Sequence, residues 1–202
     1  MKTIQRFAFA AIAVLFWSAA AQAFAVKEVT SPGGIKAWLV EEKAVPLIAM
    51  SFSFKGGSVY DPEGKEGVSE FITGMMDEGA GDMTSEAFQR RRDELAFRMS
   101  FDSSRDYFEG SFQTLSKNRD AAFDMLRLAV TSPRFDAEPL ERMRKQFILN
   151  VRDQDREPQS VAWNAWLADI APGDAYARPQ RGTEASITSI TAADLHAAHK
   201  RV

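Results

Sequence analysis

Residues 54–71, with the sequence FKGGSVYDPEGKEGVSEF, join a strand, a glycine-rich loop and the start of a helix. Apolar residues alternate over residues 47–54, which indicates a strand with one buried face. The following loop, residues 55–64, contains three glycines and a proline, a composition typical of turns. From Gly67 the apolar residues recur at helical spacing, so this stretch predicts a change from strand to helix.

Elements of both kinds surround this stretch. Residues 26–29 and 35–40 predict a hairpin around the turn sequence SPGG. Two further strands are expected to pair, at residues 100–103 and 107–114. The expected helices cover residues 67–78, 84–98, 116–131, 136–155, a segment from Pro158, and a segment from Thr191 that follows a linker over 182–190. This mixed order predicts an α+β fold, an α/β sandwich in which helices pack on a mainly antiparallel sheet. Trp163 and Trp166 are expected to anchor the core.

The amino terminus has the pattern of a secretory signal peptide. Lys2 and Arg6 precede an apolar run over residues 7–21, and small residues around Ala23 follow. This run is shorter than the roughly 20 residues that cross a membrane. We expect residues 1–23 to be removed and the protein to be exported, periplasmic or secreted, without a stable membrane anchor. An uncleaved amino-terminal anchor is the alternative.

Charge and composition exclude several classes of function. The 202 residues include 25 basic and 28 acidic side chains, so the chain has no basic field for nucleic acid. Arginines 90–92 form its only concentrated basic run, which is typical of a solvated helix face. The chain contains no cysteine, which excludes disulfides, thiolate zinc sites and cysteine nucleophiles.

The carboxyl end stops within a helical pattern. Thr191 followed by Asp194 is a typical helix start, and the sequence ends at Val202 without a stop signal. We expect residues 24–202 to be one domain and the first half of a longer two-domain protein.

Several motifs in order resemble the insulinase/pitrilysin family of peptidases, the M16 family. They are residues 54–71, Pro133-Arg-Phe135, Asp155-Arg-Glu-Pro158 and Gly182-Thr-Glu-Ala-Ser-Ile187. The resemblance covers nearly all of residues 24–202. It implies the amino-terminal M16 peptidase domain as the fold.

The resemblance also shows what the chain lacks. Active family members carry His-x-x-Glu-His on the first helix and a more distant glutamate, which together bind zinc and activate water. The matching positions are Glu70, Thr73 and Gly74, with Asn150 at the distant position, or Val151 if the register shifts by one. Because none of these sets restores the ligands and the base, we expect no catalytic residues and no zinc bound by this chain.

Two other groups of side chains contain atoms that metal ions bind. Glu70, Asp77 and Glu78 offer oxygens to calcium or magnesium, but Glu70 and Asp77 are two helical turns, about 10 Å, apart. A solvated helix end is the favoured interpretation. His196 and His199 lack an acidic companion other than Asp194, and we expect them on a surface helix.

The resemblance implies a function for a copy without zinc. Such a chain would be the non-catalytic subunit that forms a chamber with a homologous zinc-bearing M16 subunit and encloses peptides or unfolded polypeptides. The family's substrate-pairing strand matches Ser100, Phe101, Asp102 and Ser103, although an ordinary internal strand is equally consistent with these residues. A peptide-binding scaffold and an atypical metal-dependent peptidase are the alternatives.

Overall fold

The computed structural model describes residues 25–201, so the expected signal peptide at residues 1–23 lies outside the described part. The chain divides into two compact units, with the boundary between Val45 and Pro46. The expectation of one domain over residues 24–202 did not include this division. Within the described residues, no helix combines the length and the apolar character that a membrane crossing needs.

The first unit contains the expected hairpin. Strand β1 (Val26–Thr30) pairs antiparallel with β2 (Lys36–Val40), with Val26 opposite Val40. Salt bridges join Lys27 to Glu41 and Lys36 to Glu28. All residues of both strands are exposed, so alternation of burial plays no part within this unit.

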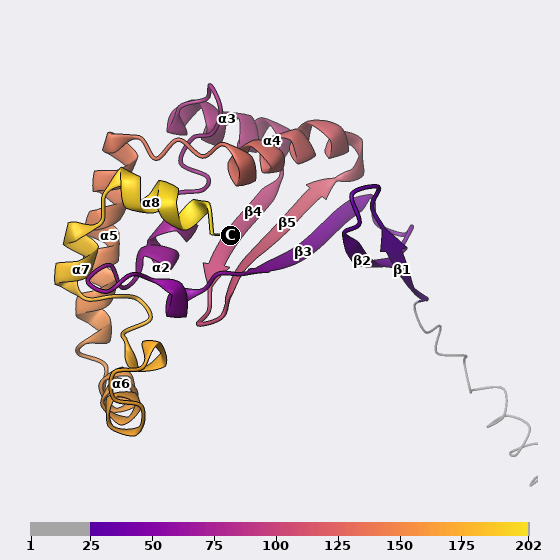
Figure 1. The fold of residues 1–202 in the computed structure, drawn as a ribbon. Helices are drawn as coiled ribbons and strands as arrows, with labels where there is room; N and C mark the ends of the chain where they lie inside the picture. The colour runs from indigo at the N-terminus through magenta and orange to yellow at the C-terminus, as the bar shows by residue number, and fades with distance from the viewer. Residues whose placement is uncertain (1–24, 202) are drawn as a thin grey trace, which may run out of the picture. The chain divides into compact units, whose positions relative to one another are not determined.

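The second unit is built on a three-stranded antiparallel sheet in the order β3-β5-β4 (Figure 1). Its strands are β3 (Leu47–Lys55), β4 (Arg98–Ser103) and β5 (Tyr107–Leu115). Leu47 pairs with Leu115, and Ser103 pairs with Phe108. The antiparallel pairing of the two predicted strands is confirmed, and so is the α+β fold class.

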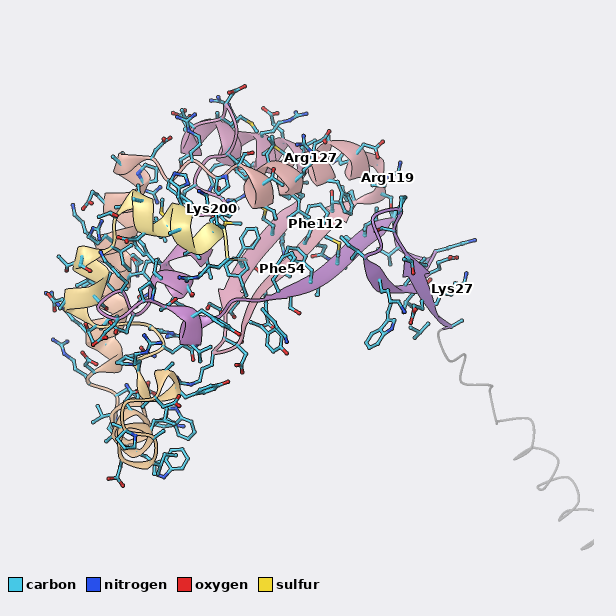
Figure 2. The ribbon with its side chains drawn as sticks, in the orientation of Figure 1. Lys27, Phe54, Phe112, Arg119, Arg127 and Lys200 are labelled. Carbon is cyan, nitrogen blue, oxygen red and sulfur yellow. The ribbon has the colours of Figure 1, made fainter. Side chains whose placement is uncertain are left out.

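Helices α3 (Ser85–Leu95) and α4 (Arg119–Thr131) cover one face of this sheet (Figure 1). Alternate residues of β5 are buried. The ring of Phe112, which is labelled in Figure 2, has its centroid 4.8 Å from that of Phe123 on α4. The buried residues of this cluster are Ala80, Phe88, Leu95, Phe97, Phe112, Ala122, Met125, Leu126 and Ala129.

A second cluster joins helices α2 (Val68–Thr73), α5 (Ala137–Gln154), α7 (Glu184–Ser189) and α8 (Ala192–His199) to the end of the sheet. Its largest fully buried side chains include Phe71, Ile72, Met75, Met76, Phe108, Ile187, Ile190 and Leu195. Phe101 and Val130 pack against both clusters, so the core of this unit is continuous.

Two sequence predictions about helices were wrong. The first helix was expected over residues 67–78, but α2 ends at Thr73, and the backbone N–H groups of Met75 and Glu78 donate to carbonyls three residues earlier. The apolar spacing continues because Met75 and Met76 are buried within these turns. The expected linker over 182–190 contains α7, which begins with a capping box of Thr183 and Ser186.

Helix α6 (Pro158–Ile170) corrects a third expectation. Trp163 and Trp166 were expected in the core, but they are 53% and 50% exposed. Leu167 is the buried residue of α6. Short 3-10 segments complete the described chain, at Ser58–Tyr60 (η1), Ser116–Asn118 (η2) and Ala175–Ala177 (η3).

Candidate functional site

Asp61 fixes the start of α2, the helix that carries the zinc-motif positions. Its carboxylate accepts hydrogen bonds from the backbone N–H of Gly67 at 2.9 Å and of Ser69 at 3.2 Å, and from the Ser69 hydroxyl. Arg201 adds an ion pair at 3.3 Å. Asp61 is only 3% exposed, so the loop of residues 56–67 ends in a buried, charged cap.

Two glycines bring the first and last sequence motifs into contact. Gly67 has φ 87°, and a Cβ on it would lie 2.5 Å from the carbonyl oxygen of Arg181. Gly182 has φ 77°, and its Cβ would lie 2.1 Å from the carbonyl oxygen of Glu66. Only glycine permits both the positive φ and this backbone approach. The contact holds Arg181 beside the start of α2.

Glu70 lies at the position of the first zinc histidine, and its carboxylate forms an ion pair with an arginine. Its Oε1 lies 3.6 Å from Nε of Arg181, and its side chain is 16% exposed. Burial raises the pKa of the Glu70 carboxyl, Arg181 opposes this rise, and the charges of Asp102 and Asp61 add to it. The sheet edge at Asp102 and the zinc-motif helix are therefore electrostatic neighbours.

Thr73 and Gly74 occupy the other two motif positions. The Thr73 hydroxyl donates to the backbone carbonyl of Glu70 at 2.7 Å, a local helix contact that provides no base. A Cβ on Gly74 would meet Met143 Cε at 2.8 Å and the Phe147 ring at 3.1 Å. Two α5 side chains thus fill the space that a histidine at position 74 would need, and the residues here do not fit a zinc ion.

The distant ligand position is equally unsuitable. Asn150 is exposed on α5, and its Oδ1 accepts a hydrogen bond from Gln146 at 3.1 Å. Val151 is buried in the cluster that contains Phe71 of α2. The residue that faces the α2 cluster is therefore apolar, and the neighbouring polar amide points to solvent.

The three carboxylates considered for a harder cation each have an arginine partner. Asp77 pairs with Arg92 at 2.9 Å, and Glu78 pairs with Arg142 at 2.5 Å. Burial raises the pKa of the Asp77 carboxyl, and Arg92 opposes this rise. Across residues 25–201, no group of three or more histidine, aspartate or glutamate side chains is arranged to hold a metal ion.

The two histidines have structural contacts on α8. His199 Nε2 lies 2.7 Å from the carbonyl oxygen of Val130, and the His196 ring stands edge-on to Phe135 at 4.9 Å. These contacts tie α8 to the end of α4 and to the loop before α5.

Strand β4, which carries the proposed substrate-pairing residues, is an edge strand of the described sheet. The Ser103 N–H donates to the Asp102 side chain, and the Ser103 carbonyl accepts from Gln180 at 2.8 Å, so both groups point away from β5. Bonded and non-bonded positions alternate along an antiparallel pair. The main-chain groups of Met99 and Phe101 therefore point to the same outer side, where no described strand pairs with them.

The sheet face opposite α3 and α4 is polar. A shallow hollow of about 490 Å³ on this face is lined by hydroxyls and carboxylates, from Ser51, Ser53, Ser100, Ser111, Asp102 and Glu109. Asp102 and Glu109 are direct cross-strand neighbours, and Ser100 Oγ lies 2.8 Å from Ser111 Oγ. Of the four predicted substrate-pairing residues, Ser100 and Asp102 belong to this face, while Phe101 packs against the core.

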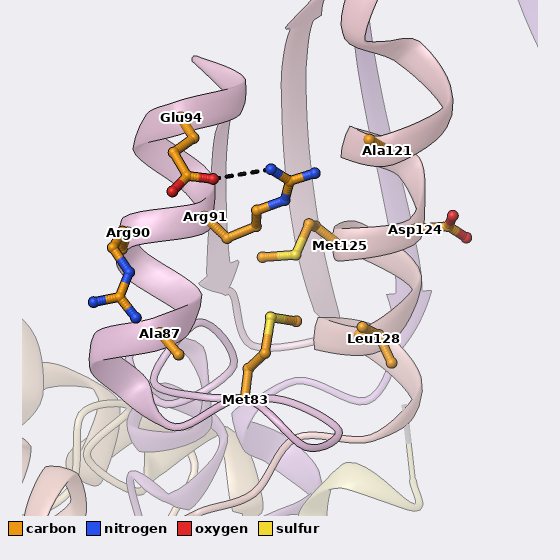
Figure 3. Close-up of a pocket in the computed structure, with 9 residues that line it drawn as sticks. All are labelled: Met83, Ala87, Arg90, Arg91, Glu94, Ala121, Asp124, Met125 and Leu128. Carbon is orange, nitrogen blue, oxygen red and sulfur yellow. Dashed lines mark hydrogen bonds and ion pairs between the residues drawn. The ribbon is translucent and has the colours of Figure 1, made fainter.

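A separate hollow of about 420 Å³ lies between α3 and α4 (Figure 3). Met83 and Met125 project into it, and its rim carries an ion pair between Arg91 and Glu94 at 2.9 Å (Figure 3). Arg90 pairs with Glu86 at 3.5 Å. Arg92 pairs with Asp77. Each arginine of residues 90–92 therefore has its own acidic partner.

A family model for the insulinase peptidases, family M16, matches residues 39–184 of this chain. The chain belongs to the M16 family. The match includes α2, the β4 edge and α5, so it applies to the site described above.

Two curated relatives are similar in sequence. The non-peptidase homolog YmxG of Helicobacter pylori is 20% identical over 155 residues, which cover 77% of this chain and 36% of the relative. Subunit 1 of the bovine mitochondrial cytochrome b-c1 complex is 19% identical over 155 residues, which cover 77% of this chain and 32% of the subunit. The chain spans about a third of the length of these relatives.

Two solved structures share the fold. The peptidase M16 inactive domain from Pseudomonas fluorescens aligns with a TM-score of 0.79 and 25% identity, covering 87% of this chain and 43% of that one. A protease from Helicobacter pylori aligns with a TM-score of 0.74 and 16% identity, covering 88% and 43%. One of these M16 relatives is named a non-peptidase homolog, and one of the solved structures is described as an inactive domain.

Sequence reasoning found the substituted motif positions but missed the residues that surround them. Arg181 pairs with Glu70, and Met143 and Phe147 fill the space beside Gly74. The glycine at position 74 was a usable signal, because an absent side chain within a buried helix often marks a close approach by a neighbour. No local pattern indicates which neighbour makes this approach.

Proposed function

We propose that this chain is the non-catalytic subunit of an exported M16 zinc peptidase. A homologous subunit with the complete His-x-x-Glu-His motif supplies the zinc, and the two chains together enclose a peptide or an unfolded polypeptide. Export rests on the signal-peptide pattern of residues 1–23.

The packing of Gly74 against Met143 and Phe147 carries this proposal. A peptidase that had lost only its ligands would leave a cavity on α2, whereas here α5 side chains fill the ligand position. In this proposal, side-chain packing takes the place of a zinc ligand in this chain, and the zinc that hydrolysis in the assembly requires comes from the partner.

The edge of β4 supports a role in peptide binding. The outward main-chain groups of Met99 and Phe101 can receive an extended peptide as an added strand, and main-chain bonding tolerates many sequences. Ser103 already bonds Gln180, so the added strand would end before it. Ser100 and Asp102 would contact the peptide from the polar face.

The relatives support the role of a subunit. One is named as a non-peptidase homolog, and another is named as a subunit of a larger complex. These names describe those proteins, and they make a non-enzymatic role the stronger candidate for this chain.

Co-purification tests the proposal. The tagged mature chain is recovered from the exported fraction of its native cells, its companions are identified by mass spectrometry, and peptide hydrolysis is measured with and without a chelator. We expect an M16 chain with His-x-x-Glu-His and chelator-sensitive hydrolysis. Recovery without that chain and without hydrolysis would support the peptide-binding scaffold, and hydrolysis by the isolated chain would support an atypical enzyme.

A further inference from the structure

Helix α6 presents apolar side chains to solvent along one face. Trp163, Trp166 and Ile170 follow at i, i+3 and i+7, and each is at least half exposed. The two indole rings lie 4.9 Å apart between centroids at an interplanar angle of 36°. Each tryptophan supports the other, so the pair forms a preformed aromatic surface.

A hollow of about 690 Å³ lies at this surface and is called here the tryptophan hollow. Its lining consists of Glu157, Gln159, Ser160, Ala162, Trp163 and Trp166. Glu157 is the only ionisable residue in this lining. The Ser160 hydroxyl donates to Glu157 Oε2 at 3.0 Å, which holds the carboxylate beside the rings.

We propose that the tryptophan hollow binds an arginine or lysine side chain from a basic segment of a partner polypeptide. A cation over an indole face is attracted by the ring quadrupole, and Trp is the best aromatic residue for this interaction. Glu157 adds a charge-assisted hydrogen bond to the same group. Arginine fits best, because its planar guanidinium can stack on an indole and pair with a carboxylate at once.

The charge of Glu157 favours a basic segment over an apolar partner, a membrane or a second copy of the chain. A purely apolar partner or an anionic membrane would bury the Glu157 carboxylate without a cation, which costs free energy. A second copy of the chain has a net charge of −3 over its whole sequence, so its overall charge does not complement Glu157. A basic segment covers the two rings and neutralises the carboxylate. This inference does not depend on the proposed function, because α6 and the β4 edge are separate elements.

Tryptophan fluorescence tests the inference in the full mature chain. The substitution Trp38→Phe removes the indole of the exposed hairpin and leaves Trp163 and Trp166 as the reporters in residues 24–202. The probes are N-acetyl-glycyl-arginyl-glycine amide and the same peptide with citrulline, which keeps the shape of arginine without its charge. We expect a saturable fluorescence change with the arginine peptide. The citrulline peptide should bind with an affinity lower by a factor of about ten or more.

Two variants sharpen the test. Glu157→Gln keeps the size and the contact with Ser160, and it should weaken arginine binding about 3- to 10-fold. Trp166→Ala should abolish the response at an unchanged thermal midpoint. Equal binding of both peptides or no effect of Glu157→Gln would overturn the inference. So would dissociation of a dimer by Trp166→Ala, which would assign the surface to a second copy, or a response to phosphatidylglycerol vesicles alone, which would assign it to a membrane.

Discussion

Met143 of α5 occupies the space beside Gly74, the residue that directly follows α2, so that a Cβ on Gly74 would lie 2.8 Å from Met143 Cε. The Phe71 and Phe147 rings continue the same contact, with centroids 4.9 Å apart in an edge-to-face arrangement. The two helices are thus packed through the position at which an active M16 peptidase would carry a zinc histidine. Loss of the metal site and close helix packing have the same structural basis.

Gly74→His should therefore destabilise the protein. The imidazole has to displace Met143 and the Phe147 ring, and overpacking of this kind typically costs about 1–3 kcal/mol. Met143→Ala in the same chain should recover part of the loss, because it removes the nearest atom. The measurement is urea unfolding of residues 24–202. Thr73→His, one residue earlier and half-buried, is the matched control and should cost about 1 kcal/mol or less. Full stability of Gly74→His would contradict the packing argument.

Glu70→Gln should show a stability effect that depends on pH. Burial raises the pKa of Glu70 in the folded protein, with Asp102 and Asp61 adding to the rise and Arg181 opposing it. A raised pKa means that the folded chain binds the Glu70 proton more tightly than the unfolded chain does. This contribution to stability is complete below the unfolded pKa and is lost as the pH rises through the folded pKa. The glutamine variant does not titrate, so it does not lose stability in this way. Its stability relative to wild type should increase from pH 4 to pH 7.5.

Urea midpoints of both proteins at the two pH values provide the measurement. Glu63→Gln, at an exposed position of the loop that precedes α2, controls for the removal of one negative charge. A difference between Glu70→Gln and wild type that stays constant with pH would show that the Arg181 pair fully offsets burial, and a relative stability of the variant that falls as the pH rises would show that the pair outweighs burial.

The sequence could predict elements whose signals are local. Alternation over residues 47–54 located β3, and the acidic residue Asp136 located the start of α5. Asp136 directly precedes α5, but its side chain does not cap the helix and pairs with Arg134 at 2.7 Å instead. Local signals therefore fixed the fold class and the strand pairing.

Features that depend on tertiary contacts could not be predicted. The apolar spacing through Met75 and Met76 reports burial, which turns can provide as well as a helix. The choice between Asn150 and Val151 is a shift of one residue, and only the packing of α5 on α2 decides which side chain faces inward. Trp163 and Trp166 were misplaced because hydrophobicity alone does not distinguish a core anchor from an exposed binding surface.

Asp61→Ala should strongly destabilise the loop that precedes α2. The buried carboxylate accepts bonds from the backbone of Gly67 and Ser69 and from the Ser69 hydroxyl, and alanine leaves these donors unsatisfied. We expect a loss of about 3 kcal/mol or more. Ser69→Ala removes only the hydroxyl bond and should cost about 1 kcal/mol. Calorimetric unfolding of the three proteins checks the order, and equal stability of Asp61→Ala and Ser69→Ala would contradict it.

Met99→Pro tests the peptide-binding edge of β4. The Met99 N–H points to the outer side of the sheet, where proline is tolerated, so the substitution removes one outward donor without removing a bond to β5. Met99→Ala is the matched control, because it loses the same side chain and keeps the donor. Binding of fluorescein-labelled β-casein, an unfolded polypeptide, is followed by anisotropy, and equal thermal midpoints of the two variants establish that both are folded. We expect Met99→Pro to bind about 2- to 10-fold more weakly than Met99→Ala, the value of one net main-chain hydrogen bond. Equal affinities would mean that an extended peptide does not add to this edge, and the role assigned to β4 would then have to be abandoned.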